Sequence, residues 1–182
     1  PKFEYLAARS IAEVCDLLAA HGNRAELLAG GTDLLLQMRR RETTPAYVIG
    51  LKGVAELSGL RKLDDGGIAV GAMTTLHTFL TSPVVRGTYG VLAEAAAGIG
   101  GPELRNVATV GGNIAGALPC ADLPPALMTL GAKVRLASSA GERIVPLEDF
   151  FPSFGVTAAR PDELLTGVQL PSVPSFSGGV YL

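Results

Sequence analysis

The first fifty residues alternate between amphipathic and continuously apolar segments. A capping box at residues 10–13 predicts the start of a helix, whose apolar positions recur every three or four residues until Gly22 ends it. Apolar runs at 26–29 and 46–49 predict short strands, and residues 34–41 between them predict a second helix with a basic last turn. Strands and helices that alternate within about fifty residues predict a small α/β lobe with parallel strands.

The pattern changes near residue 53, where short apolar alternations replace the longer segments. Short helices are expected at residues 74–80, 89–99 and 124–130. Strand patterns that suit an antiparallel sheet occupy a hairpin at residues 60–70 and single strands at 133–137, 143–145 and 164–170. Residues 107–115 are expected to be extended as well. The sequence therefore predicts an α+β fold with two lobes, residues 1–53 and 54–170, followed by a linker-like tail, residues 171–182.

Composition and charge exclude several classes of function. The chain has 182 residues, of which 48% are hydrophobic and 18% charged, enough apolar material for a packed core. The net charge is −2, no basic run is longer than Arg39-Arg40-Arg41, and no Trp is present, so the usual features of a nucleic-acid-binding surface are missing. No apolar run approaches the ~18 residues of a membrane span.

Metal-ligating side chains are few. Cys15, Cys120, His21 and His77 are the only cysteines and histidines, whereas iron–sulfur clusters and structural zinc sites use about four ligands with close-spaced pairs. We therefore expect no metal site and no catalytic acid or base in this chain. His77 is expected to be a surface or hydrogen-bonded histidine rather than a general base, and Cys120 is expected to be a small buried side chain. The low cysteine content favours a cytoplasmic location.

Two diglycine turns carry the candidate chemistry. Ala29-Gly30-Gly31-Thr32-Asp33 lies between a predicted strand and a predicted helix, and Thr109-Val110-Gly111-Gly112-Asn113 lies in the second lobe. Glycines allow a ligand to approach the backbone closely, and the N–H, hydroxyl and amide groups of such turns suit phosphate. Each turn alone also fits a tight connection or close packing. Together they suit a ligand with two phosphates between the lobes, although neither matches a dinucleotide fingerprint or a P-loop.

Asp122 is a further candidate because it precedes the helix that Pro124-Pro125 opens. Its carboxylate can accept hydrogen bonds from sugar or ribityl hydroxyls. It can equally be the N-cap of that helix, and the sequence leaves both roles open.

Five segments, in order along nearly the whole chain, resemble one family. They are 29–33 (AGGTD), 70–76 (VGAMTTL), 105–115 (RNVATVGGNIA), 121–127 (ADLPPAL) and 146–151 (PLEDFF). The chain resembles the FAD-binding medium subunit of the molybdenum hydroxylases, the type found in xanthine dehydrogenase and carbon monoxide dehydrogenase. The resemblance implies a two-lobed FAD-binding fold with FAD in the cleft and both diglycine loops at the pyrophosphate.

The resemblance also implies a set of cofactor-binding residues by position. These are Leu28, Ala29, Gly30, Gly31, Thr32 and Asp33 in the first loop, Thr109, Gly111, Gly112 and Asn113 in the second, and Ile99 and Asp122 near the flavin. Ala121 departs from the Ser that many relatives carry. The family also has a further C-terminal domain that supplies flavin contacts and is expected to follow Leu182.

The implied function is an FAD-binding electron-transfer subunit of a molybdenum-containing hydroxylase or dehydrogenase, an oxidoreductase built as a heteromer. A molybdopterin-binding large subunit would oxidise the substrate, a small subunit would relay electrons through 2Fe-2S clusters, and FAD would pass them to NAD, a quinone or another acceptor. The alternatives are a stand-alone flavin-dependent oxidoreductase and a nucleotide-binding module without a redox role.

Overall fold

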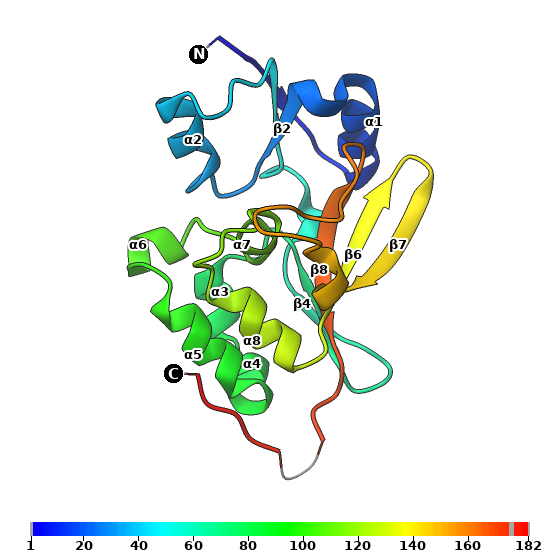
Figure 1. The fold of residues 1–182 in the computed structure, drawn as a ribbon. Helices are drawn as coiled ribbons and strands as arrows, with labels where there is room; N and C mark the ends of the chain where they lie inside the picture. The colour runs from blue at the N-terminus through cyan, green and yellow to red at the C-terminus, as the bar shows by residue number, and fades with distance from the viewer. Residues whose placement is uncertain (1, 175–176, 182) are drawn as a thin grey trace.

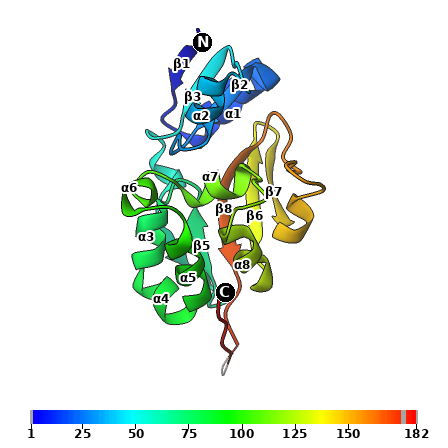
Figure 2. The same cartoon turned by 60° about the vertical axis from the view of Figure 1, so that its left-hand side comes forward.

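The computed structural model describes residues 2–174 and 177–181, which form two lobes (Figures 1 and 2). The first lobe is a parallel three-stranded sheet of order β1-β3-β2 with two helices. Its elements are β1 (Glu4–Ala7), α1 (Ile11–His21), the 3-10 helix η1 (Gly22–Arg24), β2 (Ala25–Leu28), α2 (Leu34–Arg40) and β3 (Tyr47–Gly50). The predicted α/β lobe with parallel strands is confirmed.

Helix α1 joins the two lobes. The Ser10 hydroxyl accepts the Glu13 N–H at 3.1 Å, and the Glu13 carboxylate accepts the Arg9 N–H at 2.8 Å, which satisfies two free donors at the helix start. Helix α1 contacts β3 and also the second-lobe strands β6 (Lys133–Ser138) and β8 (Leu164–Leu170). One apolar cluster therefore contains residues of both lobes: Ala8, Val14, Cys15, Leu18, Ile49, Leu51, Val54, Leu57, Ala137 and Leu164.

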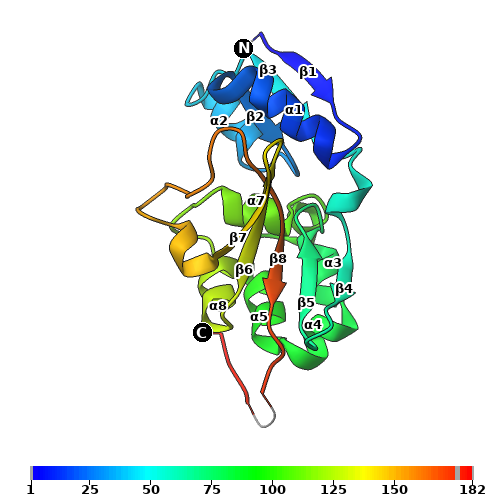
Figure 3. The same cartoon turned by 90° about the vertical axis from the view of Figure 1, so that its right-hand side faces the viewer.

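The second lobe is an antiparallel five-stranded sheet of order β4-β5-β8-β6-β7, with helices packed on one face (Figures 2 and 3). Its remaining strands are β4 (Leu60–Lys62), β5 (Ile68–Gly71) and β7 (Gly141–Pro146). Its helices are α3 (Leu76–Thr81), α4 (Pro83–Thr88), α5 (Gly90–Gly98), α6 (Pro102–Arg105), α7 (Val110–Ala115) and α8 (Leu123–Thr129), with 3-10 turns η2 (Ala55–Leu57) and η3 (Leu147–Phe150). The larger apolar core lies between this sheet and the helices. The predicted α+β class and the predicted hairpin are confirmed.

The prediction of an extended segment at residues 107–115 is wrong, because residues 110–115 form helix α7. The Thr109 hydroxyl caps this helix by accepting the Gly112 N–H at 3.0 Å. Val110 and Ile114 are four residues apart and fully buried, so they form the apolar face of a single helical turn. The two glycines between them carry no side chains, which hid this helical spacing in the sequence.

The division of the chain at residue 53 stays a prediction. Strand β3 ends at Gly50 and β4 begins at Leu60, so the chain passes from one sheet to the other in this interval. The predicted linker, residues 171–182, has no helix or strand at 171–174 and 177–181, and its positions 175–176 and 182 lie outside the described residues. None of the helices in the described part of the chain is both long and apolar enough to cross a membrane.

At Gly30 the backbones of the two lobes lie very close together. A Cβ atom at Gly30 would lie 2.1 Å from the carbonyl oxygen of Val107 and 3.0 Å from the Cα atom of Ala108. Both neighbours are backbone atoms, so they cannot move aside as a flexible side chain would. Gly30 therefore allows the first diglycine loop to pack directly against the segment that precedes α7.

We expect Gly30→Ala to lower the free energy of unfolding by about 2 to 3 kcal/mol, the usual cost of overpacking. Gly87→Ala is the matched control, because a Cβ at Gly87 in α4 meets no atom within 4 Å. That change should raise stability by up to about 1 kcal/mol through higher helix propensity. Urea unfolding of both variants measures the difference. Equal stabilities would show that the close approach at Gly30 is not needed.

Candidate functional site

A cavity of about 580 Å³ lies between the two lobes, in the range typical of small-molecule sites. All predicted site residues except Leu28 line it: Ala29, Gly30, Gly31, Thr32, Asp33, Ile99, Thr109, Gly111, Gly112, Asn113 and Asp122. Leu28, the last residue of β2, supports the first loop from behind, because its Cδ1 atom lies 3.1 Å from the position of a Cβ at Gly31. The fold thus brings both diglycine segments to one cavity, while their role as cofactor contacts stays a prediction.

The first loop offers free backbone donors. In the described part of the chain, the N–H groups of Gly30, Gly31 and Thr32 donate to no other protein group. Gly31 has a φ angle of +76°, a backbone conformation that residues other than glycine rarely adopt. Successive unpaired N–H groups in such a turn form a concave donor set for an anion. This loop can therefore hold a phosphate without a basic side chain.

The second diglycine segment differs from the first, because its first backbone N–H groups are already paired. The sequence had suggested that both segments offer free donors. The N–H groups of Val110 and Gly111 donate to the carbonyls of Thr74 and Ala72 at 2.9 and 2.8 Å. A Cβ at Gly111 would lie 2.5 Å from that of Ala72. Gly111 therefore serves close packing, which was the alternative explanation for this segment.

Gly112 and Asn113, which also line the cavity, remain candidates for contact with a ligand. Gly112 is half-buried, and a Cβ added there would lie 2.9 Å from Thr109 Oγ1 and 3.8 Å from the Cβ atom of Ala29 in the first loop. The Oδ1 atom of Asn113 is buried and has no hydrogen-bond partner among the described residues. A buried acceptor without a partner is costly, so this atom favours a ligand that donates a hydrogen bond into the cavity.

Asp122 stands at the N-cap position of α8, but its side chain does not cap the helix. Instead its Oδ1 atom accepts the hydroxyl of Tyr181 at 2.8 Å. The carboxylate, followed by desolvation, raises the pKa of Tyr181, so the hydroxyl remains a donor. Of the two roles that the sequence left open for Asp122, the capping role is wrong for the side chain.

Ile99 reaches the cavity from the end of α5 because Arg105 fixes this turn. One guanidinium nitrogen of Arg105, Nη1, donates to the carbonyls of Ala97, Ile99 and Gly100 at 3.0, 3.1 and 2.6 Å. A cation at a helix C-terminus satisfies unpaired carbonyls and opposes the negative end of the helix dipole. Arg105 therefore holds Ile99 in place without touching the cavity itself.

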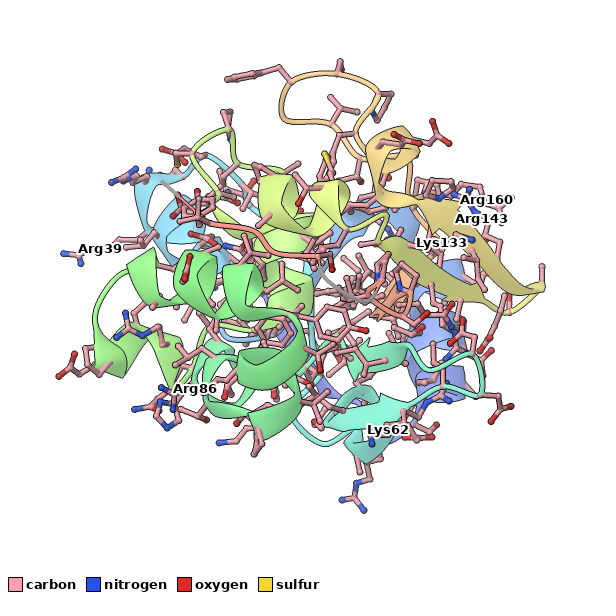
Figure 4. The ribbon with its side chains drawn as sticks, turned by 90° about the horizontal axis from the view of Figure 1, so that it is seen from below. Arg39, Lys62, Arg86, Lys133, Arg143 and Arg160 are labelled. Atoms are coloured by element: carbon pink, nitrogen blue, oxygen red, sulfur yellow. The ribbon has the colours of Figure 1, made fainter. Side chains whose placement is uncertain are left out.

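The segment before β8 supplies cavity residues that sequence reasoning missed, among them Arg160 and Glu163. Glu163 is only 6% exposed and accepts hydrogen bonds from Arg143 Nε and Nη2 at 2.6 and 2.8 Å. Arg160 adds its backbone N–H at 2.7 Å and its Nη2 atom at 2.9 Å. The two arginines lie on the same side of the molecule, away from Arg39, Lys62 and Arg86 (Figure 4).

This network holds the pKa of Glu163 at about 2, mainly through the hydrogen bond from Arg143. Glu163 thereby anchors the turn that carries Arg160 at the wall of the cavity. No recognisable motif marks residues 157–163, and the nearest sequence signal is an Arg and a Glu three residues apart. Arg143 lies on strand β7, twenty residues away, so only the fold brings Arg143, Arg160 and Glu163 together.

The charged lining of the cavity is mostly acidic. It includes Glu26, Asp33 and Asp122, whereas Arg160 is the only cationic residue among the described lining residues. An anionic ligand therefore depends on the backbone donors of the first loop rather than on a basic pocket.

Cys120 and His77 are the side chains for which redox or acid–base chemistry was considered. Cys120 is exposed and lines the cavity, so the expectation of a buried side chain is wrong. Cys120 lies in the connection between α7 and α8. The apolar residues around it did not indicate that this connection is a surface loop. His77 is exposed, as predicted. No group of His, Cys, Asp or Glu side chains in residues 2–174 and 177–181 is arranged to hold a metal ion.

The sequence of the chain is similar to those of several known proteins. The family model described as "FAD binding domain in molybdopterin dehydrogenase" matches residues 1–173. The alpha subunit of the 6-hydroxypseudooxynicotine dehydrogenase complex of Paenarthrobacter nicotinovorans is 36% identical over 181 residues, covering 100% of this chain and 61% of that protein. The carbon monoxide dehydrogenase medium chain of Afipia carboxidovorans is 34% identical over 179 residues, covering 98% and 62%.

The fold is also that of a solved structure. Carbon monoxide dehydrogenase from Hydrogenophaga pseudoflava matches with a TM-score of 0.93 and 35% identity, over 96% of this chain and 61% of that one. The chain therefore spans about three fifths of the length of the relatives that it matches. The two-lobed α+β fold expected from the sequence is confirmed.

We expect Glu163→Gln to lower the free energy of unfolding at neutral pH by about 2 kcal/mol, because a buried carboxylate loses its charge-assisted hydrogen bonds with Arg143 and Arg160. The control is Glu142→Gln, which breaks the 2.6 Å pair with Arg135 at a side chain that is 53% exposed. This second change should cost less than about 1 kcal/mol.

The same pair of variants gives a pH test. The depressed pKa means that Glu163 stabilises the fold above its ordinary value of 4.5, and that this stabilisation is lost as the pH falls toward about 2. The stability difference between the unchanged protein and Glu163→Gln should therefore shrink over this range. A constant difference from neutral pH to pH 2 would contradict the assignment.

Proposed function

Because the chain belongs to the family of FAD-binding domains of molybdopterin dehydrogenases, we propose that it is the FAD-binding electron-transfer part of a molybdenum-containing hydroxylase or dehydrogenase. The family resemblance found in the sequence, and FAD as the cofactor, are confirmed. The observation that supports the proposal most strongly is the inter-lobe cavity, which gathers both diglycine segments, Asn113 and Asp122.

The cavity residues fit an FAD molecule with its pyrophosphate at the first loop. The free N–H groups of Gly30, Gly31 and Thr32 suit phosphate oxygens, and Gly112 leaves room opposite them. The unpaired Asn113 Oδ1 atom and the Asp122 carboxylate suit hydroxyl or N–H donors of the ligand. Ile99 and the other apolar lining residues suit the faces of its rings.

Bound FAD supplies the redox chemistry, because its flavin takes up and gives off two electrons. This chain contributes binding and orientation, since its cavity offers donors to an anion and acceptors to hydroxyls. The partner subunits, a molybdopterin-binding large subunit and a small subunit with 2Fe-2S clusters, belong to the same proposal. So do electron transfer to NAD, a quinone or another acceptor, and a cytoplasmic location, which the two free cysteines favour.

The direct test is the visible spectrum of the purified chain, followed by titration of the cofactor-free protein with FAD and with ADP. We expect flavin bands near about 370 and 450 nm, one FAD per chain and much weaker binding of ADP. Equal affinities for FAD and ADP, with no flavin retained, would instead identify a nucleotide-binding module without a redox role.

The second diglycine segment can be tested at Gly112. We expect Gly112→Val to abolish FAD retention, because a branched side chain would fill the space facing Ala29 and press on Thr109 Oγ1, only 2.9 Å from the added Cβ. The flavin-to-protein ratio after desalting measures the loss. Gly87→Val in α4 is the matched control, since both changes place Val in a short helix and Gly87 is exposed and remote from the cavity. Full flavin occupancy in Gly112→Val would remove this segment from the site.

Asp122 can be tested by removal of its carboxylate. We expect Asp122→Ala to weaken FAD binding by about 1 to 3 kcal/mol, the usual contribution of a charge-assisted hydrogen bond. The stability of the cofactor-free protein should change little, because the side chain does not cap α8. Isothermal titration gives the affinity and thermal unfolding gives the stability. A large loss of stability without a loss of affinity would contradict the binding role.

A further inference from the structure

The chain after β8 folds back onto the helices of the second lobe. The buried Tyr89 donates its hydroxyl to the carbonyl of Pro171 at 2.8 Å. Further along, the backbone N–H of Tyr181 donates to the Glu94 carboxylate at 3.1 Å. The described end of the chain accordingly lies beside α5 and α8 (Figures 1 and 2). These contacts, made at both ends of residues 171–181, place the Tyr181 ring against the larger core.

Tyr181 is connected to the cavity through one atom. Its hydroxyl donates to Asp122 Oδ1 at 2.8 Å, and Asp122 lines the cavity whereas Tyr181 does not. Within the described residues, the second carboxylate oxygen of Asp122 makes no hydrogen bond. One oxygen is therefore held by the protein, and the other is available to a ligand.

A neutral donor suits this arrangement better than a cation would. A hydroxyl fixes the orientation of a carboxylate without cancelling its charge, so the free oxygen stays a strong acceptor. A side chain that is already oriented also loses less conformational freedom when the ligand binds. A tyrosine hydroxyl is protonated at neutral pH in any case, and the hydrogen bond to Asp122 raises the pKa of Tyr181 further, so the hydroxyl is a donor there.

We infer that Tyr181 is a positioning residue of the FAD site, which acts by orienting the Asp122 carboxylate toward a hydroxyl of the flavin half of the cofactor. This inference rests on the proposed function. It assigns to Tyr181 a role in cofactor affinity in addition to its contact with the larger core. It also predicts that the effect of Tyr181 depends entirely on Asp122.

The test measures the affinities of cofactor-free protein for FAD and for ADP, which shares the adenosine and pyrophosphate but lacks the flavin half. The variants are Tyr181→Phe, Asp122→Ala and the double variant. Tyr181→Phe should weaken FAD binding about tenfold, because the Asp122 carboxylate loses the hydrogen bond that orients it. The same change should leave ADP binding unchanged. In the Asp122→Ala background, the same change should have no further effect.

The matched control is Tyr89→Phe, which removes the other tyrosine hydroxyl that holds this segment but does not contact a cavity residue. It should leave both affinities unchanged. Equal losses of FAD and ADP binding in Tyr181→Phe, or equal effects of Tyr89→Phe and Tyr181→Phe, would show that the segment acts only structurally and would overturn the inference. So would an unchanged FAD affinity in Tyr181→Phe, or an effect that persists without Asp122.

Failure of the proposed function itself has a separate outcome. If the unchanged protein binds ADP and FAD equally, or binds neither, the FAD proposal fails before any variant is compared. If it binds FAD tightly and Tyr181→Phe behaves identically, only the role of Tyr181 is rejected.

Discussion

The close approach of two backbones at Gly30 is the constraint on which the site depends. The carbonyl of Val107 occupies the space that any side chain at residue 30 would need. Gly111 plays a comparable part within the second lobe, where it packs α7 directly against Ala72. With both contacts made, the first loop and the start of α7 line the same cavity. Larger residues at either position would push these closely packed segments apart.

The two diglycine segments differ in the backbone N–H groups that they offer to a ligand. Among the described residues, the N–H groups of Gly30, Gly31 and Thr32 in the first loop have no protein acceptor and can hold an anion. In the second segment, the N–H groups of Val110 and Gly111 donate to the carbonyls of Thr74 and Ala72. An anion in a cavity lined by Glu26, Asp33 and Asp122 has to be held by directional donors, because the surrounding charge opposes it. The same acidic groups suit the hydroxyl-rich part of a flavin nucleotide.

Several residues act on the cavity through others. Arg105 fixes the turn that carries Ile99, Glu163 fixes the turn that carries Arg160, and Tyr181 holds Asp122. Each is a side chain from one segment that controls the position of another. Rigid support of this kind limits the motion of the residues that meet the ligand, which lowers the entropic cost of binding.

The sequence by itself determined the fold class, both diglycine segments, the hairpin and the family, because these depend on local spacing, turn residues and short motifs. It did not determine that residues 110–115 are helical, since Gly111 and Gly112 carry no side chains between the apolar positions Val110 and Ile114. Only the tertiary structure decided which N–H groups remain free and which partner each charge receives. The contacts of Glu163 with Arg143 and of Asp122 with Tyr181 span twenty and 59 residues. Periodicity cannot report pairings over such separations, because they arise only when the sheets, helices and tail have packed together.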